Sequence, residues 1–230
     1  NLTAGSTLLL GAMGRVCMPT SKRGWWSWAK TTSVEYLLRQ SLRKIDSQHF
    51  WDLMDALPVE SIAKIEREKL KKTFKIYNFQ TDTLFFDTTN FFTYLDTTNL
   101  RCTIAQRGKN KQKRYDLRQI GLAMVVTRKD MIPLFHLTYQ GNMADAVVFR
   151  DVIETIKDRM KGLGLDREKH TVVFDRGNNS RDNMAIVERL SLHYVGALTP
   201  YHHKQLVNEA VDNFKEHDVD GSKMQVYRDK

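Results

Sequence analysis

Two aspartates each follow a run of apolar residues that is typical of a buried strand. Asp87 comes after Leu84, Phe85 and Phe86, and Asp175 ends the run in "TVVFDRG". An ionised carboxylate beside a buried strand is costly unless a cation or hydrogen-bond donors compensate its charge. Carboxylate oxygens are ligands that Mg²⁺ prefers, and pairs of such ions serve phosphoryl transfer. The pattern predicts that Asp87 and Asp175 lie close together and bind two divalent metal ions, either Mg²⁺ or Mn²⁺.

Asp175 also has a simpler explanation that the sequence leaves open. Asp175 could pair with Arg176 or cap the helix that starts at Ser180.

The tetrapeptide Asp-Thr-Thr-Asn occurs twice, beginning at Asp87 and at Asp96. Because nine is an odd number, residues nine apart in one continuous strand point to opposite faces. Asp96 lies between two extended segments, where Asp caps turns, so Asp87 is the predicted site residue and Asp96 a turn residue.

Hydrophobic periodicity divides the chain into a helical part and a mixed part. Helical spacing predicts helices over 32–45, 46–57 and 59–77, with Asp46 or Ser47 as an N-cap. After residue 82 the pattern changes, and three strands are expected over 83–95, 120–128 and 131–139. A helix over 145–164, a buried strand over 170–177, a helix over 180–190 and a second buried strand over 192–198 are expected to follow.

This order predicts an α/β fold, namely a ribonuclease H-like mixed sheet preceded by a helical N-terminal region. The sheet would combine an antiparallel three-strand meander with parallel strands, and helices would flank it. We expect a helical, basic region over 1–80, the ribonuclease H-like core over 81–200, and a helix with the start of an insertion segment over 201–230.

The charge favours a polyanionic partner. The 230 residues carry a formal net charge of +9, with a pI near 9.5. Residues 101–118 contain seven Lys and Arg against one acid, and such a loop could hold a DNA backbone without reading its sequence. The predicted DNA-binding residues are Arg107, Lys109, Lys111, Lys113 and Arg114. The alternative is a solvated hairpin loop that is charged for solubility alone.

The apolar runs, cysteines, tryptophans and histidines limit the kinds of partner and site that the sequence supports. No apolar run is long enough to span a bilayer, so no membrane partner is expected. Two cysteines in a chain of this length indicate a reducing compartment, and the expected location is the cytoplasm, in association with the nucleoid. Trp25, Trp26 and Trp28 could stack on bases or pack in a helical core, and packing is favoured. His202 and His203 lack a convincing third zinc ligand.

Three segments together resemble a known family. "LFFDTTNFF", the stretch from Gly108 to Asp145, and "VVFDRGNNSRDNMAIVERLSLHYVGAL" are similar to the DDE transposases of bacterial and archaeal insertion sequences, in the IS-four-like group. The resemblance covers roughly residues 5 to 200. It implies that Asp87 and Asp175 bind catalytic magnesium, that Gly141, Asn142 and Asp145 form the family's turn after the third strand, and that a dimer acts on DNA.

The resemblance also implies a third acid, a glutamate in a Tyr, Arg, Glu and Lys helical signature. The helix expected over 202–217 fits the signature only in part, because Asn208 stands at the glutamate position and Glu209 one step away. We therefore expect the glutamate beyond Lys230 and regard the chain as a partial one.

The implied function is Mg²⁺-dependent DNA strand cleavage and strand transfer at insertion-sequence ends. The alternative from another class is a catalytically inert, DNA-binding transposase remnant that lacks the third acid. A phosphatase of the haloacid dehalogenase type would need a second aspartate two residues after the first, and Thr89 stands there.

Overall fold

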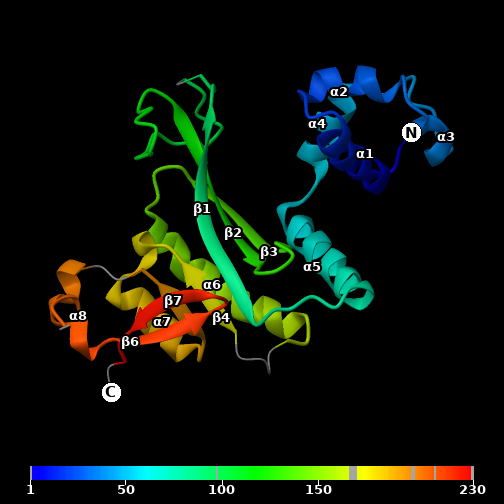
Figure 1. The fold of residues 1–230 in the computed structure, drawn as a ribbon. Helices are drawn as coiled ribbons and strands as arrows, with labels where there is room; N and C mark the ends of the chain where they lie inside the picture. Colours follow the sequence, from blue (N-terminus) through cyan, green and yellow to red (C-terminus); the bar gives the residue numbers. More distant parts are fainter. Residues whose placement is uncertain (1, 97, 166–169, 198–199, 210, 229–230) are drawn as a thin grey trace. The chain divides into compact units, whose positions relative to one another are not determined.

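The computed structural model describes residues 2–96, 98–165, 170–197, 200–209 and 211–228. The chain forms two compact units, Asn1–Glu68 and Lys69–Lys230, and the boundary falls inside one long helix. Figure 1 follows the chain through both units. Among the described residues, none of the helices combines the length and the apolar character that crossing a membrane requires.

The first unit is helical, as predicted. It contains α1 (Ala4–Cys17), α2 (Lys22–Ala29), α3 (Val34–Leu38), α4 (Ser47–Ala56) and the start of α5 (Val59–Ile76). Asp46 caps α4 by accepting hydrogen bonds from two backbone N–H groups of the first turn, which confirms one of the predicted caps. Trp25 and Trp26 are buried in the core of this unit, as the favoured packing interpretation expects, and both also line a cavity.

The single helix expected over 32–45 is wrong. Helix α3 ends after five residues because Arg39 adopts a left-handed conformation with φ 51°. The Glu35 carboxylate then accepts a hydrogen bond from the backbone N–H of Leu42. A side chain thus satisfies a donor that a longer helix would have satisfied with its own carbonyl groups. Leu42 is still fully buried, because the loop returns it to the core.

The second unit is built on a five-stranded mixed sheet, which confirms the ribonuclease H-like fold class. Strands β1, β2 and β3 pair antiparallel, and β4 and β5 add on the other side of β1 as parallel strands. The strand order is β3-β2-β1-β4-β5 (Figure 1). The strands are β1 (Thr83–Thr93), β2 (Arg118–Thr127), β3 (Pro133–Gln140), β4 (Thr171–Phe174) and β5 (His193–Gly196).

Two helices that connect the strands share one apolar core with this sheet, and Leu70 of α5 belongs to the same core. The two helices are α6 (Asp145–Gly162), which connects β3 to β4, and α7 (Arg181–Arg189), which connects β4 to β5. At the centre of the core, the ring of Phe149 from α6 makes edge contacts with two strand residues. Its centroid lies 5.2 Å from that of Phe86 and 4.8 Å from that of Phe174. One buried ring therefore supports both β1 and β4 directly before Asp87 and Asp175.

Strand β5 corrects one expectation about burial. The segment was predicted to be a buried strand, but each residue of β5 is exposed, and Val195 is 56% exposed. The strand lies at the edge of the sheet, with β4 as its one neighbour in the sheet. Leu198, the last residue of the predicted segment, lies outside the described residues.

The helix expected over 202–217 is also wrong. Among the described residues of this segment, the α-helix covers only Lys204–Val207. The chain later forms a β-hairpin around Asp220 and Gly221, which both have positive φ. Asp-Gly is a preferred pair for a tight hairpin turn of this kind, and Asp218 supports the turn by accepting a hydrogen bond from the backbone N–H of Gly221. The elements are η2 (Pro200–His202), α8 (Lys204–Val207), η3 (Val211–Asn213), β6 (Lys215–Val219) and β7 (Ser222–Val226).

Candidate active site

The pairing of β1 with β4 brings the two predicted aspartates to one level of the sheet. Phe85 lies opposite Val173 in the parallel register, and Asp87 and Asp175 each follow two residues later. Both aspartates line one pocket of about 370 Å³. The two carboxylates therefore share a pocket although 88 residues separate them in the sequence.

Asp87 lies inside its strand and not at its end, in agreement with the strand expected over 83–95. It lies inside β1, opposite Met124 of β2, and β1 continues to Thr93. Strand β4, in contrast, ends at Phe174, so the β4 side of β1 is uncovered from this level onward. Asp87 is consequently exposed at the pocket instead of buried within the sheet. Its Oδ1 accepts a hydrogen bond of 2.8 Å from the backbone N–H of Thr88.

Asp175 caps a tight turn, and that turn holds its carboxylate in place. Oδ1 accepts hydrogen bonds from the backbone N–H of Gly177 at 3.1 Å and from Nδ2 of Asn178 at 2.8 Å. Among the residues that the structure describes, none donates a hydrogen bond to Oδ2. The next helix, α7, is capped by Ser180 instead. Asp175 is thus oriented by its own turn and keeps one oxygen available.

The turn after Asp175 is anchored from beneath by a second asparagine. Asn183 is buried, and its Nδ2 donates hydrogen bonds to the carbonyl oxygens of Asn178 at 3.0 Å and Ala146 at 3.1 Å. Asn178 is itself only 2% exposed. The pair connects the Asp175 turn to the start of α6, which fixes where the carboxylate can point.

A third carboxylate, Asp145, lines the same pocket. The Tyr139 hydroxyl donates a hydrogen bond to its Oδ1 at 3.2 Å. Burial and then the negative charge of Asp145 raise the pKa of Tyr139 to about 12. The phenol therefore remains protonated as a donor at neutral pH. Its ring lies against Gly121, where a Cβ atom would come within 2.2 Å of the ring, so glycine is required there.

The basic loop contributes two of its five predicted residues to this pocket. Lys109 and Lys111 line it beside the aspartates. Gln119 holds the loop there: it is fully buried, and its Nε2 donates hydrogen bonds to the carbonyl oxygens of Lys109 at 3.2 Å and Gly141 at 2.7 Å. The loop is therefore attached to the end of the sheet near β3, and Lys109 is positioned by the fold.

The other three predicted basic residues lie elsewhere. Arg107 and Lys113 are exposed on the loop and do not line the pocket. Arg114 forms an ion pair with Asp116 through two hydrogen bonds of 2.9 and 2.8 Å. The guanidinium holds the pKa of Asp116 at about 2, well below its usual value. Because Asp116 already neutralises the guanidinium, Arg114 should attract a phosphate less strongly than the two pocket lysines do.

The second Asp-Thr-Thr-Asn segment has the predicted turn role. Asp96 lies beyond the end of β1, and its Oδ1 accepts hydrogen bonds of 2.8 Å from both the backbone N–H and the hydroxyl of Thr98. These bonds lower the pKa of Asp96. The prediction that Asp96 is a turn residue is confirmed. Thr97 of the same tetrapeptide lies outside the described residues.

The third acid of the resemblance is not at this pocket in the part of the chain that the structure describes. Glu209 lines a separate pocket together with Tyr201, His203 and Tyr227. Within the described residues, no group of three or more His, Cys, Asp or Glu side chains converges in a way that could hold one metal ion. Asp87, Asp145 and Asp175 thus line one pocket without forming a group of that kind.

Sequence reasoning missed three residues that shape the site. Tyr139 was interpreted only as part of an apolar strand, and Gln119 was not considered. Asn178 stands in "DRGNNS", where an asparagine after Asp-Arg-Gly could have suggested a side-chain cap for the turn. For Tyr139 and Gln119 the sequence carries no comparable signal, because their partners are far away in the chain.

The comparisons with known proteins bear on the fold alone. No family model and no curated protein matches the chain. A Mos1 transposase paired-end complex with left transposon end is 11% identical, with a TM-score of 0.35, over 84% of this chain and 59% of that one. The catalytic domain of Mos1 mariner transposase is 11% identical, with a TM-score of 0.35, over 63% and 66% of the two chains.

A piggyBac transposase synaptic complex with hairpin DNA is 14% identical, with a TM-score of 0.44, over 99% of this chain and 48% of that one. The chain thus spans between about half and two thirds of the length of these three proteins. These identities and TM-scores assign no function to it.

Proposed function

We propose that this chain carries the catalytic core of a DDE transposase, which cleaves DNA strands with the help of divalent metal. The observation that carries the proposal is the shared pocket of Asp87 and Asp175 beside Lys109 and Lys111. Carboxylates next to lysines suit a phosphodiester: the acids can hold metal ions, and the lysines can attract the DNA backbone.

The residues present fit a hard divalent cation. Carboxylate oxygens are the preferred ligands of Mg²⁺ and Mn²⁺, and Asp175 is held through Oδ1 by Gly177 and Asn178. Asp87 and Asp175 would hold the metal, and we propose two ions. When bound, the metal would stabilise the charge that develops at the phosphodiester and would lower the pKa of the attacking water. Asn178 is the positioning residue for Asp175, and Lys109 and Lys111 orient the DNA strand.

The DNA substrate, the strand-transfer step and the homodimer are proposed from the family resemblance. The DNA substrate would be the ends of an insertion sequence of the IS-four-like group, the reaction would proceed to strand transfer into target DNA, and a homodimer would act on the DNA. The protein would be cytoplasmic and associated with the nucleoid. The third acid would be a glutamate outside the residues that form this pocket.

The test is nicking of DNA that carries the element's ends by the full-length protein. We expect nicking with Mg²⁺ or Mn²⁺ and none after chelation. Nicking that continues in the presence of a chelator would contradict the proposal. If the protein binds the same DNA but never nicks it with any divalent metal, the alternative of an inert DNA-binding remnant is the correct one.

The lysines at the pocket predict a change in salt dependence. Each Lys that neutralises a phosphate adds about 0.9 to the slope of log affinity against log salt concentration. The double variant Lys109→Gln, Lys111→Gln should lower this slope by roughly 1.8 in DNA titrations monitored by fluorescence anisotropy. The control is Arg128→Gln, Lys129→Gln in the exposed β2–β3 turn, which does not line the pocket. Equal slopes in the two double variants would exclude the proposed contact.

Substitution of Asn178 should weaken metal binding, although Asn178 acts only through Asp175. The variant Asn178→Ala removes the hydrogen bond to Asp175 Oδ1, and loss of such an outer partner typically weakens metal binding about 10- to 100-fold. We expect this loss in Mn²⁺ titrations. The melting temperature should change little, because the buried Oδ1 of Asn178 has no hydrogen-bond partner among the residues that the structure describes. Asn179→Ala is the control, since that amide donates to the Ala197 carbonyl. Unchanged Mn²⁺ affinity in Asn178→Ala would remove its positioning role.

A further inference from the structure

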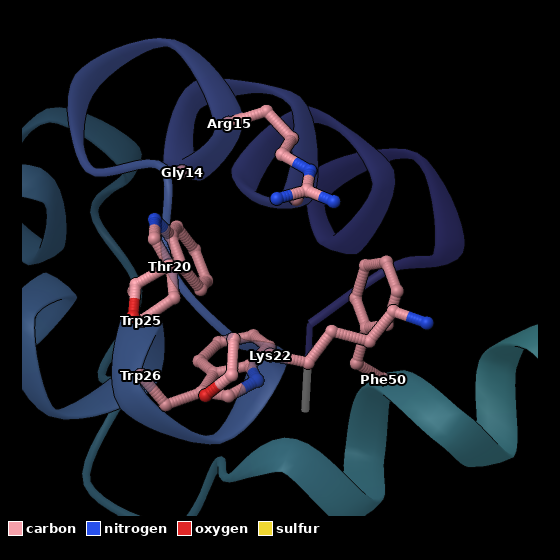
Figure 2. Close-up of a pocket in the computed structure, with 9 residues that line it drawn as sticks. Gly14, Arg15, Thr20, Lys22, Trp25, Trp26 and Phe50 are labelled. Carbon is pink, nitrogen blue, oxygen red and sulfur yellow. The ribbon is translucent and has the colours of Figure 1, made fainter. Parts of the chain in front are cut away.

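A second cavity lies in the helical unit, apart from the aspartate pocket. It has a volume of about 330 Å³ and lies where α1, α2 and α4 meet. Figure 2 shows the side chains of Arg15, Trp25, Trp26 and Phe50 around one hollow. Well-packed protein interiors leave few spaces larger than a water molecule, and this volume is at the lower end of the range for small-molecule sites. The cavity can therefore accept a compact ligand.

The walls of the cavity are aromatic and firmly held. Trp25 and Trp26 are 5% and 3% exposed, and their rings meet edge to face with centroids 4.6 Å apart. Trp25 lies directly against α1, where a Cβ atom on Gly14 would come within 1.8 Å of its Nε1. Glycine at position 14 is thus what lets the indole reach this place. Flat, rigid walls of this kind favour a planar ring, because stacking then costs little side-chain entropy.

The rim of the cavity is cationic. Arg15 and Lys22 line it, and neither forms an ion pair with a carboxylate among the described residues. The Lys22 Nζ lies 3.8 Å from the centroid of the Trp51 ring and 5.6 Å from that of Phe50. Burial and the nearby positive charge of Arg15 lower the pKa of Lys22. Two neighbouring cations without a counter-charge favour an anionic group between them.

We propose that this cavity binds one unpaired nucleotide, with the base against the aromatic walls and the phosphate between Arg15 and Lys22. A planar ring joined to an anion is what the walls and the rim together can recognise, since aromatic side chains stack on any base and cations pair with its phosphate. The choice of a nucleotide among such ligands rests on the proposed action on DNA. The site would hold a base that has left the duplex.

The tryptophans provide a direct measurement. The four tryptophans of the chain are Trp25, Trp26, Trp28 and Trp51, and all lie in the helical unit. Indole fluorescence therefore reports on this unit and not on the aspartate pocket. Titration of the 230-residue chain with thymidine 5′-monophosphate, without divalent metal, should quench the fluorescence saturably. Thymidine alone and inorganic phosphate alone should each bind at least roughly tenfold more weakly, since each lacks half of the recognised groups.

Substitutions at the rim test the assignment. Arg15→Gln and Lys22→Gln should each weaken binding of the nucleotide roughly tenfold. Arg23→Gln is the matched control, because Arg23 is an exposed cation on the same helix as Lys22 and does not line the cavity. Equal binding of inorganic phosphate and the nucleotide, or equal losses in all three variants, would overturn the proposal. The absence of saturable quenching would overturn it as well, and would leave the cavity to a different ligand such as an acidic, aromatic peptide.

The same titration separates this inference from the proposed function. Nucleotide binding should be unchanged in Asp87→Asn, because the cavity and Asp87 belong to different units. Nucleotide binding by a protein that never nicks DNA would sustain the cavity assignment and defeat the transposase. Metal-dependent nicking by a protein that binds no nucleotide at the cavity would do the reverse.

Discussion

Replacing Asp175 by Asn is expected to lower Mg²⁺-dependent nicking by about 10³-fold, which corresponds to roughly 4 kcal/mol of lost transition-state stabilisation. Asparagine has the same shape as aspartate, and its Oδ1 can still accept the hydrogen bonds from Gly177 and Asn178. The substitution thus removes the negative charge and leaves the turn intact. Asp87→Asn should cause a loss of the same order, because both carboxylates serve one pocket.

The matched control for both variants is Asp96→Asn in the repeated Asp-Thr-Thr-Asn tetrapeptide. Asp96 caps a turn beyond β1, and asparagine can accept the same hydrogen bonds from Thr98. Its nicking rate should equal that of the unchanged protein. Mn²⁺ titrations of the three variants provide a second measurement, in which only Asp87→Asn and Asp175→Asn should lose affinity. If either of these variants nicks at the unchanged rate, its metal assignment is wrong.

The second large effect is expected at Phe149. This ring is fully buried and makes edge contacts with Phe86 and Phe174, the residues directly before the two aspartates. Phe149→Ala removes both contacts and leaves a cavity, at a cost of about 3–5 kcal/mol in the free energy of unfolding. For a unit of this size we expect a fall in melting temperature of roughly 10 °C. Chemical denaturation and calorimetry measure the two quantities.

Val147→Ala is the control for Phe149, since Val147 lies on the same helix and is 43% exposed. It should change the free energy of unfolding by no more than about 0.5 kcal/mol. Phe149→Leu keeps most of the volume and should cost less than Phe149→Ala. It should also weaken Mn²⁺ binding, because the support beneath Asp87 and Asp175 loosens while the unit remains folded. Equal stability of Phe149→Ala and Val147→Ala would mean that the ring does not connect the two strands.

The order of the main elements could be predicted from the sequence alone. The run from β1 to β5, the helices α5, α6 and α7, and the turn role of Asp96 follow from short-range patterns such as apolar periodicity and turn residues. The same patterns selected Asp87 and Asp175, because a carboxylate after an apolar strand is unusual in any fold. Local chemistry is enough for such features, since each depends on residues a few positions apart.

Local patterns failed where a side chain or a turn overrode them. The expected helix over 32–45 stops at α3 because Arg39 turns left-handed and Glu35 accepts a hydrogen bond from the Leu42 N–H. The expected helix over 202–217 gives way to a hairpin at Asp220 and Gly221. In both places a few specific hydrogen bonds and backbone angles outweigh the weak preference of the surrounding residues for a helix.

Local patterns in the chain thus establish which residue types are available for chemistry, their order and most of the elements that carry them. The three-dimensional fold was needed to show that Asp87 and Asp175 share one pocket and that Lys109 and Lys111 line it too. It was also needed to show that Arg114 pairs with Asp116 and that Glu209 lines a different pocket. The physical reason is that such convergence depends on the parallel register of β1 with β4 and on long-range hydrogen bonds such as those of Gln119. These contacts join residues far apart in the chain, where periodicity carries no information about proximity.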